Sequence, residues 1–212
     1  MKKILISIFA IALFISGCST KSDELYNLPA NAWYEQIIKD IRDRDLELAD
    51  SHFISMASEH IASPLLEEMM LILANAHIED EEYIMSNFYL DEYMKRYGTS
   101  KKIEYASYLK IKANFNSFIL PNRNQQLLLD TIDDTRVFMD KYPNSIYRPM
   151  VETILTKLEL GEYYLDGEIA SLYSRTKKKD SAQAYKEKLE NSSLKDAQMI
   201  KPELPWYRGI FE

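Results

Sequence analysis

Apolar residues recur three and four positions apart between Pro29 and Asp166, a spacing that places them on one face of successive α-helices. Glycine occurs in this stretch only at Gly98 and Gly161, whereas Leu, Ile, Met, Ala, Glu and Lys, which favour helices, are abundant. No run of alternating apolar and polar residues bounded by turn dipeptides predicts a strand. The pattern therefore predicts an all-α domain.

Proline, glycine and polar loops divide this stretch into helices. Pro64 suits the first turn of a helix, Gly98 suits the end of one, and Pro143 stops another. The first two predicted helices cover about residues 30–44 and 46–61. The third runs from 64 to the acidic stretch at 79–82, the fourth runs from that stretch to 97, and the fifth covers about 101–118. The sixth covers about 124–142, the seventh ends near 173, and the eighth covers about 179–191.

Helices of about 15 residues joined in pairs by short loops suggest a repeat with a period near the roughly 34 residues of tetratricopeptide units. A small residue in the second helix of each pair would let the two helices approach closely. We therefore predict a tetratricopeptide-like α-solenoid of about four helix pairs, with a short final repeat and an extended C-terminal tail. An irregular helical bundle without a true repeat is the alternative. The proposed markers of the repeat are Ala49, Ser86, Thr131 and Ser181.

The N-terminus carries an export signal. Lys2 and Lys3 precede an apolar run over residues 4–15, which is shorter than the roughly 20 residues that a membrane-spanning helix needs. Small residues then lead to Cys18, and Ile15-Ser16-Gly17-Cys18 resembles the bacterial lipobox. Because Cys18 is the single cysteine in the chain, it has no partner for an intramolecular disulfide. We predict cleavage before Cys18 and lipidation of its side chain; an ordinary signal peptide with a chance cysteine is the alternative.

The predicted organisation is a lipoprotein signal peptide (1–17), a lipid-anchored tether (18–28), a tetratricopeptide-like helical domain (29–194) and a tail rich in proline and aromatic residues (195–212). Ser19, rather than aspartate, follows the cysteine, which by resemblance to bacterial sorting rules favours the outer membrane. We therefore expect a protein lipid-anchored in the outer membrane, with a water-soluble domain in the periplasm.

The net charge narrows the range of partners. The whole chain carries a formal charge of −7, which becomes −9 when Lys2 and Lys3 leave with the signal peptide. The only basic cluster is Lys177 to Lys179. This balance argues against nucleic acid as a partner and against broad electrostatic adhesion to anionic lipid. We expect contact with the membrane through the N-terminal lipid.

The sequence contains few residues in patterns typical of catalysis or metal binding. His52, His60 and His77 lack the spacing of a helical zinc site, so we expect no metal. No glycine-rich phosphate loop and no G-x-S-x-G elbow occur, so we expect no cofactor and no catalytic residue. Carboxylates cluster at Glu67-Glu68, Asp80-Glu81-Glu82, Asp91-Glu92 and Asp133-Asp134. A glycan-cleaving enzyme would need two of them to face each other across a cleft, although such clusters are more often solvated faces or first turns of helices.

Aromatic residues are numerous, with 15 Tyr, 8 Phe and 2 Trp. Several tyrosines lie close together along predicted helices, including Tyr105, Tyr108, Tyr163 and Tyr164. Packing between helices explains most of them, because tyrosine can bury its ring while its hydroxyl stays in contact with water. The remainder suggest a concave surface that accepts an extended or helical partner segment.

Three blocks resemble a known family. They run from Phe138 to Tyr147 (FMDKYPNSIY), from Ile103 to Lys110 (IEYASYLK) and from Gly167 to Tyr173 (GEIASLY). In this order, and together with the lipobox, they resemble the ComL or BamD family, the tetratricopeptide-repeat lipoproteins of the outer-membrane β-barrel assembly (Bam) complex. The final repeat of that family is missing here.

The resemblance implies a non-enzymatic scaffold. Its expected partners are the POTRA domains of the barrel-inserting subunit BamA, precursor outer-membrane proteins and other Bam lipoproteins. By repeat position, the precursor groove is expected around Trp33, Tyr34, Phe53, Glu67 and Tyr83. The contact with the barrel-inserting subunit is expected around Tyr147, Arg148, Tyr163, Tyr164 and Asp166.

The C-terminal tail contains aromatic residues that would need a binding surface. Trp206, Tyr207 and Phe211 would be costly to leave exposed to water, which suggests that the tail docks in the last groove of the array or on a partner.

A periplasmic repeat lipoprotein that scaffolds cell-wall or division enzymes is one alternative to the Bam scaffold. A peptidoglycan-active enzyme that uses paired carboxylates is another.

Overall fold

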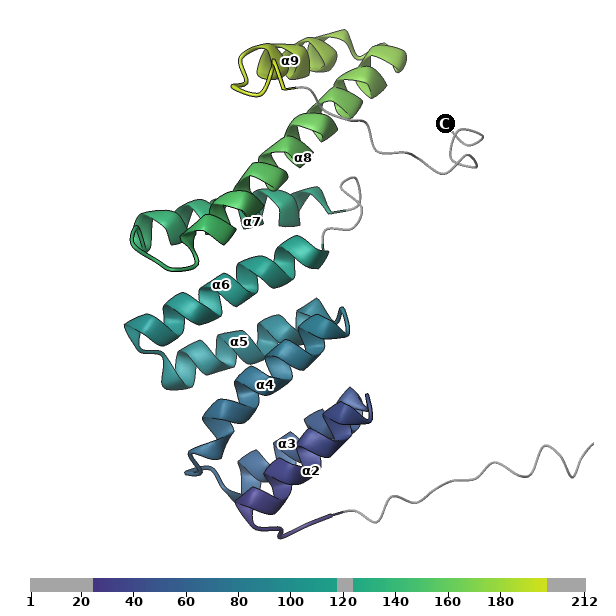
Figure 1. The fold of residues 1–212 in the computed structure, drawn as a ribbon. Helices are drawn as coiled ribbons and strands as arrows, with labels where there is room; N and C mark the ends of the chain where they lie inside the picture. The colour runs from purple at the N-terminus through teal and green to yellow at the C-terminus, as the bar shows by residue number, and fades with distance from the viewer. Residues whose placement is uncertain (1–24, 118–123, 198–212) are drawn as a thin grey trace, which may run out of the picture. The chain divides into compact units, whose positions relative to one another are not determined.

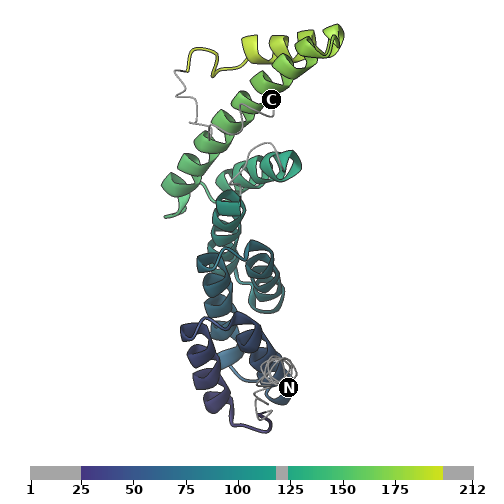
Figure 2. The same ribbon diagram turned by 90° about the vertical axis from the view of Figure 1, so that its right-hand side faces the viewer.

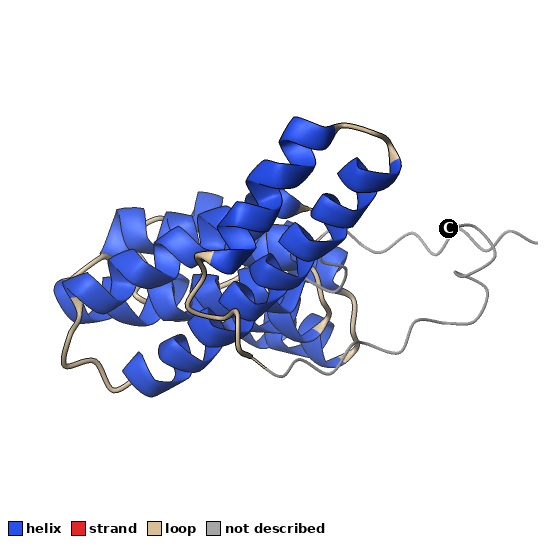
Figure 3. Cartoon of the chain, turned by 90° about the horizontal axis from the view of Figure 1, so that it is seen from above, coloured by secondary structure: helices blue, strands red, loops and turns tan. Residues whose placement is uncertain are grey.

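The computed structural model describes residues 25–117 and 124–197, and these ranges contain eight α-helices and no strand (Figures 1 and 3). Their ends lie within two residues of the predicted ones, so the all-α prediction is confirmed. Cys18 and the tail that follows Ala197 lie outside the described residues. The helices are α2 (Ala30–Arg42), α3 (Leu46–Glu59), α4 (Leu65–Glu79), α5 (Tyr83–Tyr97), α6 (Ser100–Ser117), α7 (Gln125–Lys141), α8 (Arg148–Arg175) and α9 (Lys179–Glu190).

The described residues form two compact units, which divide between Leu65 and Leu66. In the first unit, α2 and α3 pack against each other as a helical hairpin. The side chain of Asp45 caps α3 by accepting a 3.0 Å hydrogen bond from the N–H of Leu48. The core of this hairpin contains Trp33 and Ile37 from α2, and Ala49, Phe53 and Met56 from α3.

Three helix pairs share one loop geometry. In each pair, three residues link the helices, and the middle residue has a left-handed backbone conformation, with φ near 60°. The N–H of the third linking residue bonds to the carbonyl five positions earlier, which is the Schellman arrangement that satisfies the end of a helix. These bonds are Asp45 to Asp40 at 3.0 Å, Glu82 to His77 at 2.8 Å and Lys178 to Tyr173 at 3.0 Å, and the left-handed residues are Arg44, Glu81 and Lys177.

The second unit contains α4 to α9. From α5 onward each helix packs on the next, and α6 also contacts α8. The ring of His77 on α4 stacks on Tyr89 of α5, with centroids 5.6 Å apart. Figures 1 and 2 show α9 folded back along the C-terminal half of the long helix α8. One core cluster of this unit consists of Ile111, Leu128, Ile132, Phe138, Val151, Ile154, Leu158 and Leu165.

Most of the predicted repeat markers are buried between helices. Ala49, Ser86 and Thr131 are almost fully buried, whereas Ser181 is only half-buried. Its neighbour Ala182 is buried instead, so the marker of the last pair was placed one residue too early. Consecutive packing of helix pairs confirms the tetratricopeptide-like α-solenoid.

Candidate partner-binding surfaces

Two residues expected in the precursor groove belong to the core of the first unit. Trp33 is 0% exposed and Phe53 is 6% exposed, so neither ring offers a surface to a partner segment. The indole Nε1 of Trp33 donates a 2.6 Å hydrogen bond to Glu59, whose other carboxylate oxygen accepts the N–H of Asn27 at 2.9 Å. The structure therefore corrects the placement of Trp33 and Phe53: their apolar rings serve packing.

These hydrogen bonds predict an acid-sensitive first unit. The N–H of Asn27 and the indole of Trp33 lower the pKa of Glu59 below its ordinary 4.5. The stability that they contribute is therefore present above about pH 4.5 and is lost as the pH falls through the folded pKa. We expect Glu59→Gln to flatten the fall in thermal unfolding temperature between pH 6 and pH 3, roughly the range of carboxylate titration. Parallel profiles for the wild type and Glu59→Gln would contradict this, and Glu35→Gln, at an exposed position of α2, is the control.

Of the other groove candidates, Tyr34 lies in the first unit, and Glu67 and Tyr83 lie in the second. Tyr34 is half-buried and lines a depression on α2 together with Lys39 and Arg42. Glu67 on α4 accepts a 3.4 Å hydrogen bond from the hydroxyl of Tyr93 and forms an ion pair with Lys102 on α6. Glu67 therefore links three helices, and burial followed by the charge of Glu67 raises the pKa of Tyr93.

Tyr83 lies at the start of α5 and borders a cavity of about 610 Å³. Burial, followed by the charge of Glu81, raises the pKa of its hydroxyl. Residues from α5, from the end of α6 and from the start of α7 border the same cavity, and besides Tyr83 four of them carry amide or hydroxyl groups: Asn87, Asn114, Ser117 and Asn124. The walls of this cavity combine polar and apolar residues.

Tyr147 and Arg148 lie where α8 begins. The ring of Tyr147 stacks on Tyr108 with centroids 4.6 Å apart and an interplanar angle of 8°, and it also contacts Tyr105. Arg148 donates a 3.1 Å hydrogen bond to the carbonyl of Met139 and pairs with a glutamate one turn later. Beside these residues, Ile146 is 76% exposed and Met150 is 45% exposed. We name Ile146, Tyr147, Arg148 and Met150 the loop patch.

Tyr163 and Asp166 lie in the second half of α8, beside a cavity of about 260 Å³. Asp166 is buried and pairs with Lys188 of α9 at 2.7 Å, and Glu162 binds the same ammonium at 2.8 Å. Burial alone would lower the pKa of Lys188, but its hydrogen bonds to Asp166 and Glu162 and their charges raise it overall. This network attaches α9 to α8.

The five residues expected to contact the barrel-inserting subunit do not form one cluster. Along a helix with a rise of about 1.5 Å per residue, Arg148 and Tyr163 lie roughly 22 Å apart. The loop patch and the region around Tyr163, half-buried Tyr164 and Asp166 are therefore two separate surfaces of α8. Repeat position alone could not show this separation.

The sequence analysis did not identify two groups of polar residues that join helices. Lys188 was not among the predicted site residues, although a buried carboxylate at Asp166 requires a cation nearby. Asn87 and Asn114, which join α5 to α6 through a 2.6 Å hydrogen bond, were not noticed at all. They are 27 residues apart, and no local pattern relates them.

Several residues of the acidic clusters form ion pairs. Asp91 pairs with Lys110 at 2.7 Å, and Glu92 pairs with Arg96 at 3.0 Å. The pKa of Asp134 is raised, first by burial, against the opposing charge of Lys110. In the described ranges, no cluster of three or more His, Cys, Asp or Glu residues has an arrangement that could hold a metal ion. Nor does any described helix have the length and apolar character needed to cross a bilayer.

The fold and its surfaces define a helical-repeat protein of the tetratricopeptide type, a class whose stacked helices present extended surfaces to other proteins. The chain belongs to the YfiO family, described as outer membrane lipoprotein, whose pattern matches residues 27–191. It is 37% identical over 214 residues to the outer membrane protein assembly factor BamD of Helicobacter pylori, an alignment that covers 100% of this chain and 97% of the relative. The resemblance predicted from three short blocks is confirmed, and so is the outer-membrane localisation.

Proposed function

We propose that this lipoprotein is a scaffold of the outer-membrane β-barrel assembly complex, held in place by lipid on Cys18. The observation that supports the proposal is the sequence similarity, 37% identity along the whole chain, to a relative named as an outer membrane protein assembly factor. On this proposal the C-terminal half binds the POTRA domains of the barrel-inserting subunit, and the N-terminal half receives precursor outer-membrane proteins. The protein itself catalyses no reaction.

The loop patch is the part of α8 that we assign to the barrel-inserting subunit. Aromatic residues, methionine and arginine are enriched in protein interfaces, and all three kinds occur in this patch. Ile146 and Met150 expose apolar surface, and the ring of Tyr147 stacks on that of Tyr108. A preformed surface of this kind lowers the entropy cost of binding.

Purification of the full-length lipidated protein in mild detergent tests the proposal. We expect the barrel-inserting subunit to co-purify, and we expect Arg148→Glu to reduce its recovery at least about fivefold, because a reversed charge in an interface typically costs more than 1 kcal/mol. Arg96→Glu is the matched control, because Arg96 on α5 also pairs with a glutamate four residues away. Equal recovery with both variants would contradict the assignment of the loop patch.

The two alternatives predict different results in the same preparation. Recovery of cell-wall or division enzymes without the barrel-inserting subunit would favour the other kind of scaffold. Release of muropeptides from peptidoglycan by the purified protein would favour an enzyme. The ion pairs of Asp91 with Lys110 and of Glu67 with Lys102 favour the scaffold, because each of these clustered carboxylates is paired with a cation.

A further inference from the structure

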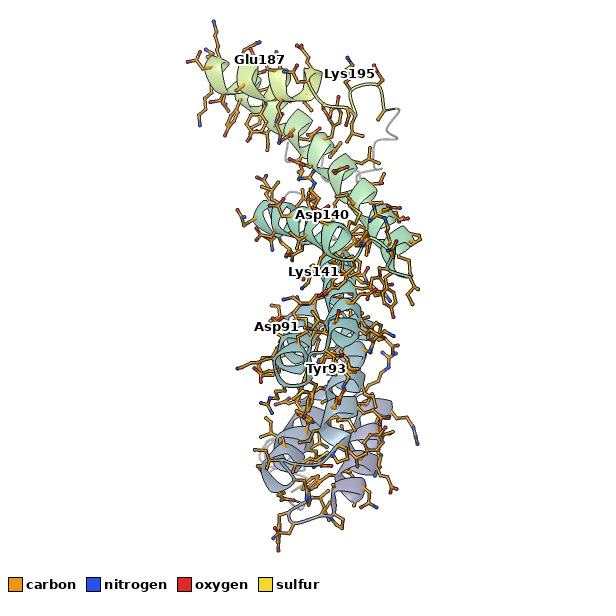
Figure 4. The ribbon with its side chains drawn as sticks, turned by 90° about the vertical axis from the view of Figure 1, so that its left-hand side faces the viewer. Asp91, Tyr93, Asp140, Lys141, Glu187 and Lys195 are labelled. Atoms are coloured by element: carbon orange, nitrogen blue, oxygen red, sulfur yellow. The ribbon has the colours of Figure 1, made fainter. Side chains whose placement is uncertain are left out.

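Three large apolar side chains of the first unit are well exposed. Tyr26, which precedes α2, is 74% exposed, and Ile61, which follows α3, is 81% exposed. Ile54 on α3 is 66% exposed and lies five residues, roughly 7.5 Å, before the end of that helix. Figure 4 shows the side chains of this unit on its purple helices. We name Tyr26, Ile54 and Ile61 the anchor-side patch.

Two hydrogen bonds hold the segment before α2 at the end of α3. The N–H of Asn27 donates to Glu59 at 2.9 Å, and the carbonyl of the residue after Asn27 accepts from the ring of His60 at 2.6 Å. Tyr26 directly precedes Asn27, and Ile61 directly follows His60. Tyr26 and Ile61 therefore lie at the same end of the helical hairpin, the end at which the chain from Cys18 enters it.

Charge distinguishes the two ends of this hairpin. The far end, where α2 turns into α3, exposes four successive charged residues, Arg42 to Asp45, and the exposed Glu47 follows in the first turn of α3. From Ser51 to Ser58, in contrast, the exposed residues of α3 are only serine and isoleucine. The next carboxylate, Glu59, has both oxygens occupied by hydrogen bonds from the indole of Trp33 and a backbone N–H. The end that faces the tether therefore presents a nearly neutral surface.

The tether limits how far the anchor-side patch can lie from the membrane. Six residues separate Cys18 from Leu25, and an extended chain spans at most about 3.6 Å per residue, so Leu25 lies within about 25 Å of Cys18. Helix α3, with 14 residues, is only about 21 Å long. A contact linked to an anchor by so short a chain forms at an effective concentration on the order of millimolar. Weak apolar contacts with the bilayer are therefore enough to persist.

We propose that the anchor-side patch lies in the interfacial layer of the outer membrane, so that the first unit contacts the lipid bilayer directly as well as through acyl chains on Cys18. Tyr26 lies at the level of the headgroups, which suits a ring that is apolar and a hydroxyl that is polar. Ile54 and Ile61 reach the boundary with the acyl chains. This inference rests on lipidation of Cys18, which is part of the proposed function. It adds a second membrane contact, which fixes the orientation of the first unit.

The small size of the patch favours a bilayer over a protein partner. A stable protein interface buries about 800 Å² on each side and involves roughly 20–30 residues. The anchor-side patch supplies three large apolar side chains, which are too few for such an interface. Insertion beside an existing lipid anchor needs only a few apolar side chains, because the anchor has already brought them to the surface.

The charge of the protein determines what kind of lipid contact this is. The mature chain carries a formal charge of −9, so anionic headgroups repel it as a whole. Attraction must therefore come from burial of the apolar side chains. Salt screens charge interactions and leaves apolar burial in place, so we expect the contact to persist at high ionic strength.

A single fluorescent label on the lipidated protein tests the proposal. Acylation of Cys18 leaves no other thiol in the chain, so Ile61→Cys supplies one labelling position, and Glu47→Cys, exposed at the far end of α3, is the matched control. Each protein is placed at low density in vesicles of phosphatidylethanolamine and phosphatidylglycerol. We expect aqueous iodide to quench the label at position 61 at least about fivefold less than at position 47, because side chains about 5–10 Å below the surface are shielded from water.

A further variant separates the effect of the patch from that of the label. Tyr26→Ser and Ile54→Ser, added together to Ile61→Cys, should restore quenching to the level of the control. Circular dichroism should show every variant folded, because the substituted side chains are exposed. Continued protection of the label in the triple variant would show that the label itself enters the bilayer and would overturn the assignment to the patch.

The remaining outcomes distinguish the patch from the anchor and from the scaffold. Equal quenching at positions 61 and 47 in vesicles that carry the protein would reject the patch and leave the anchor intact. Protection that increases with protein density at constant lipid would indicate contact with a second copy and would also overturn the proposal. Failure of the unlabelled protein to float with the vesicles would reject the anchor and the patch with it. Recovery of the barrel-inserting subunit from detergent tests the scaffold independently of all three.

Discussion

Replacement of Cys18 by alanine is expected to move the protein from the outer membrane to the soluble periplasmic fraction without unfolding its helices. Each buried methylene of a lipid contributes about 0.8 kcal/mol, and several acyl chains together anchor a protein firmly. The chain has no second cysteine to accept lipid. Since the described helices begin at Ala30, twelve residues beyond Cys18, the packing of the fold does not depend on the anchor. Membrane fractionation and circular dichroism measure the two effects.

Ser19→Ala is the control for this experiment, because it changes the neighbouring residue and keeps the cysteine. It should remain in the outer membrane. If Cys18→Ala stayed in the membrane fraction, lipidation at this position would be wrong. If it lost its helical signal, the anchor would contribute to folding and not only to location.

Replacement of Trp33 by alanine is expected to lower the free energy of unfolding of the first unit by about 3–5 kcal/mol. Trp33 is fully buried among the side chains of a two-helix unit, so little other core can compensate for the cavity. The substitution also removes the indole that donates to Glu59. Urea unfolding followed by circular dichroism measures the change.

Tyr26→Ala is the control, because Tyr26 is 74% exposed. Surface substitutions usually change stability by less than about 0.5 kcal/mol, so this variant should unfold like the wild type. A loss below about 1 kcal/mol for Trp33→Ala would contradict the burial seen in the structure. It would also restore Trp33 as a candidate for the precursor groove.

The burial of Trp33 and Phe53, two residues expected in the precursor groove, could not be predicted from the sequence. Trp33 and Phe53 were assigned to a surface because aromatic residues on a repeat helix can face either the core or a partner. Helical periodicity identifies the apolar face, but a hairpin buries that face against whichever helix returns on it. In the first unit α3 covers Trp33, and no property of the residues around position 33 indicates this.

The loops show a similar division between local and tertiary information. The acidic run at Glu81 correctly predicted a break between helices, although it lacks the glycine that usually occupies the left-handed position of a Schellman ending. Arg44, Glu81 and Lys177 all adopt φ near 60° there. Non-glycine residues accept this conformation because packing of the two joined helices outweighs its cost of about 1–2 kcal/mol.

The sequence by itself predicted the features that arise from near neighbours: the export signal and cysteine, the helices of the described ranges, their pairing and the resemblance to the family. Each depends on residues within a few turns of one another, so a linear pattern contains the necessary information. Only the tertiary structure decided which polar groups meet. Lys188 neutralises Asp166, and Asn87 binds Asn114 but keeps one buried oxygen unsatisfied. Both pairs join different helices, and the energy of a buried polar group depends on partners that folding brings from distant positions.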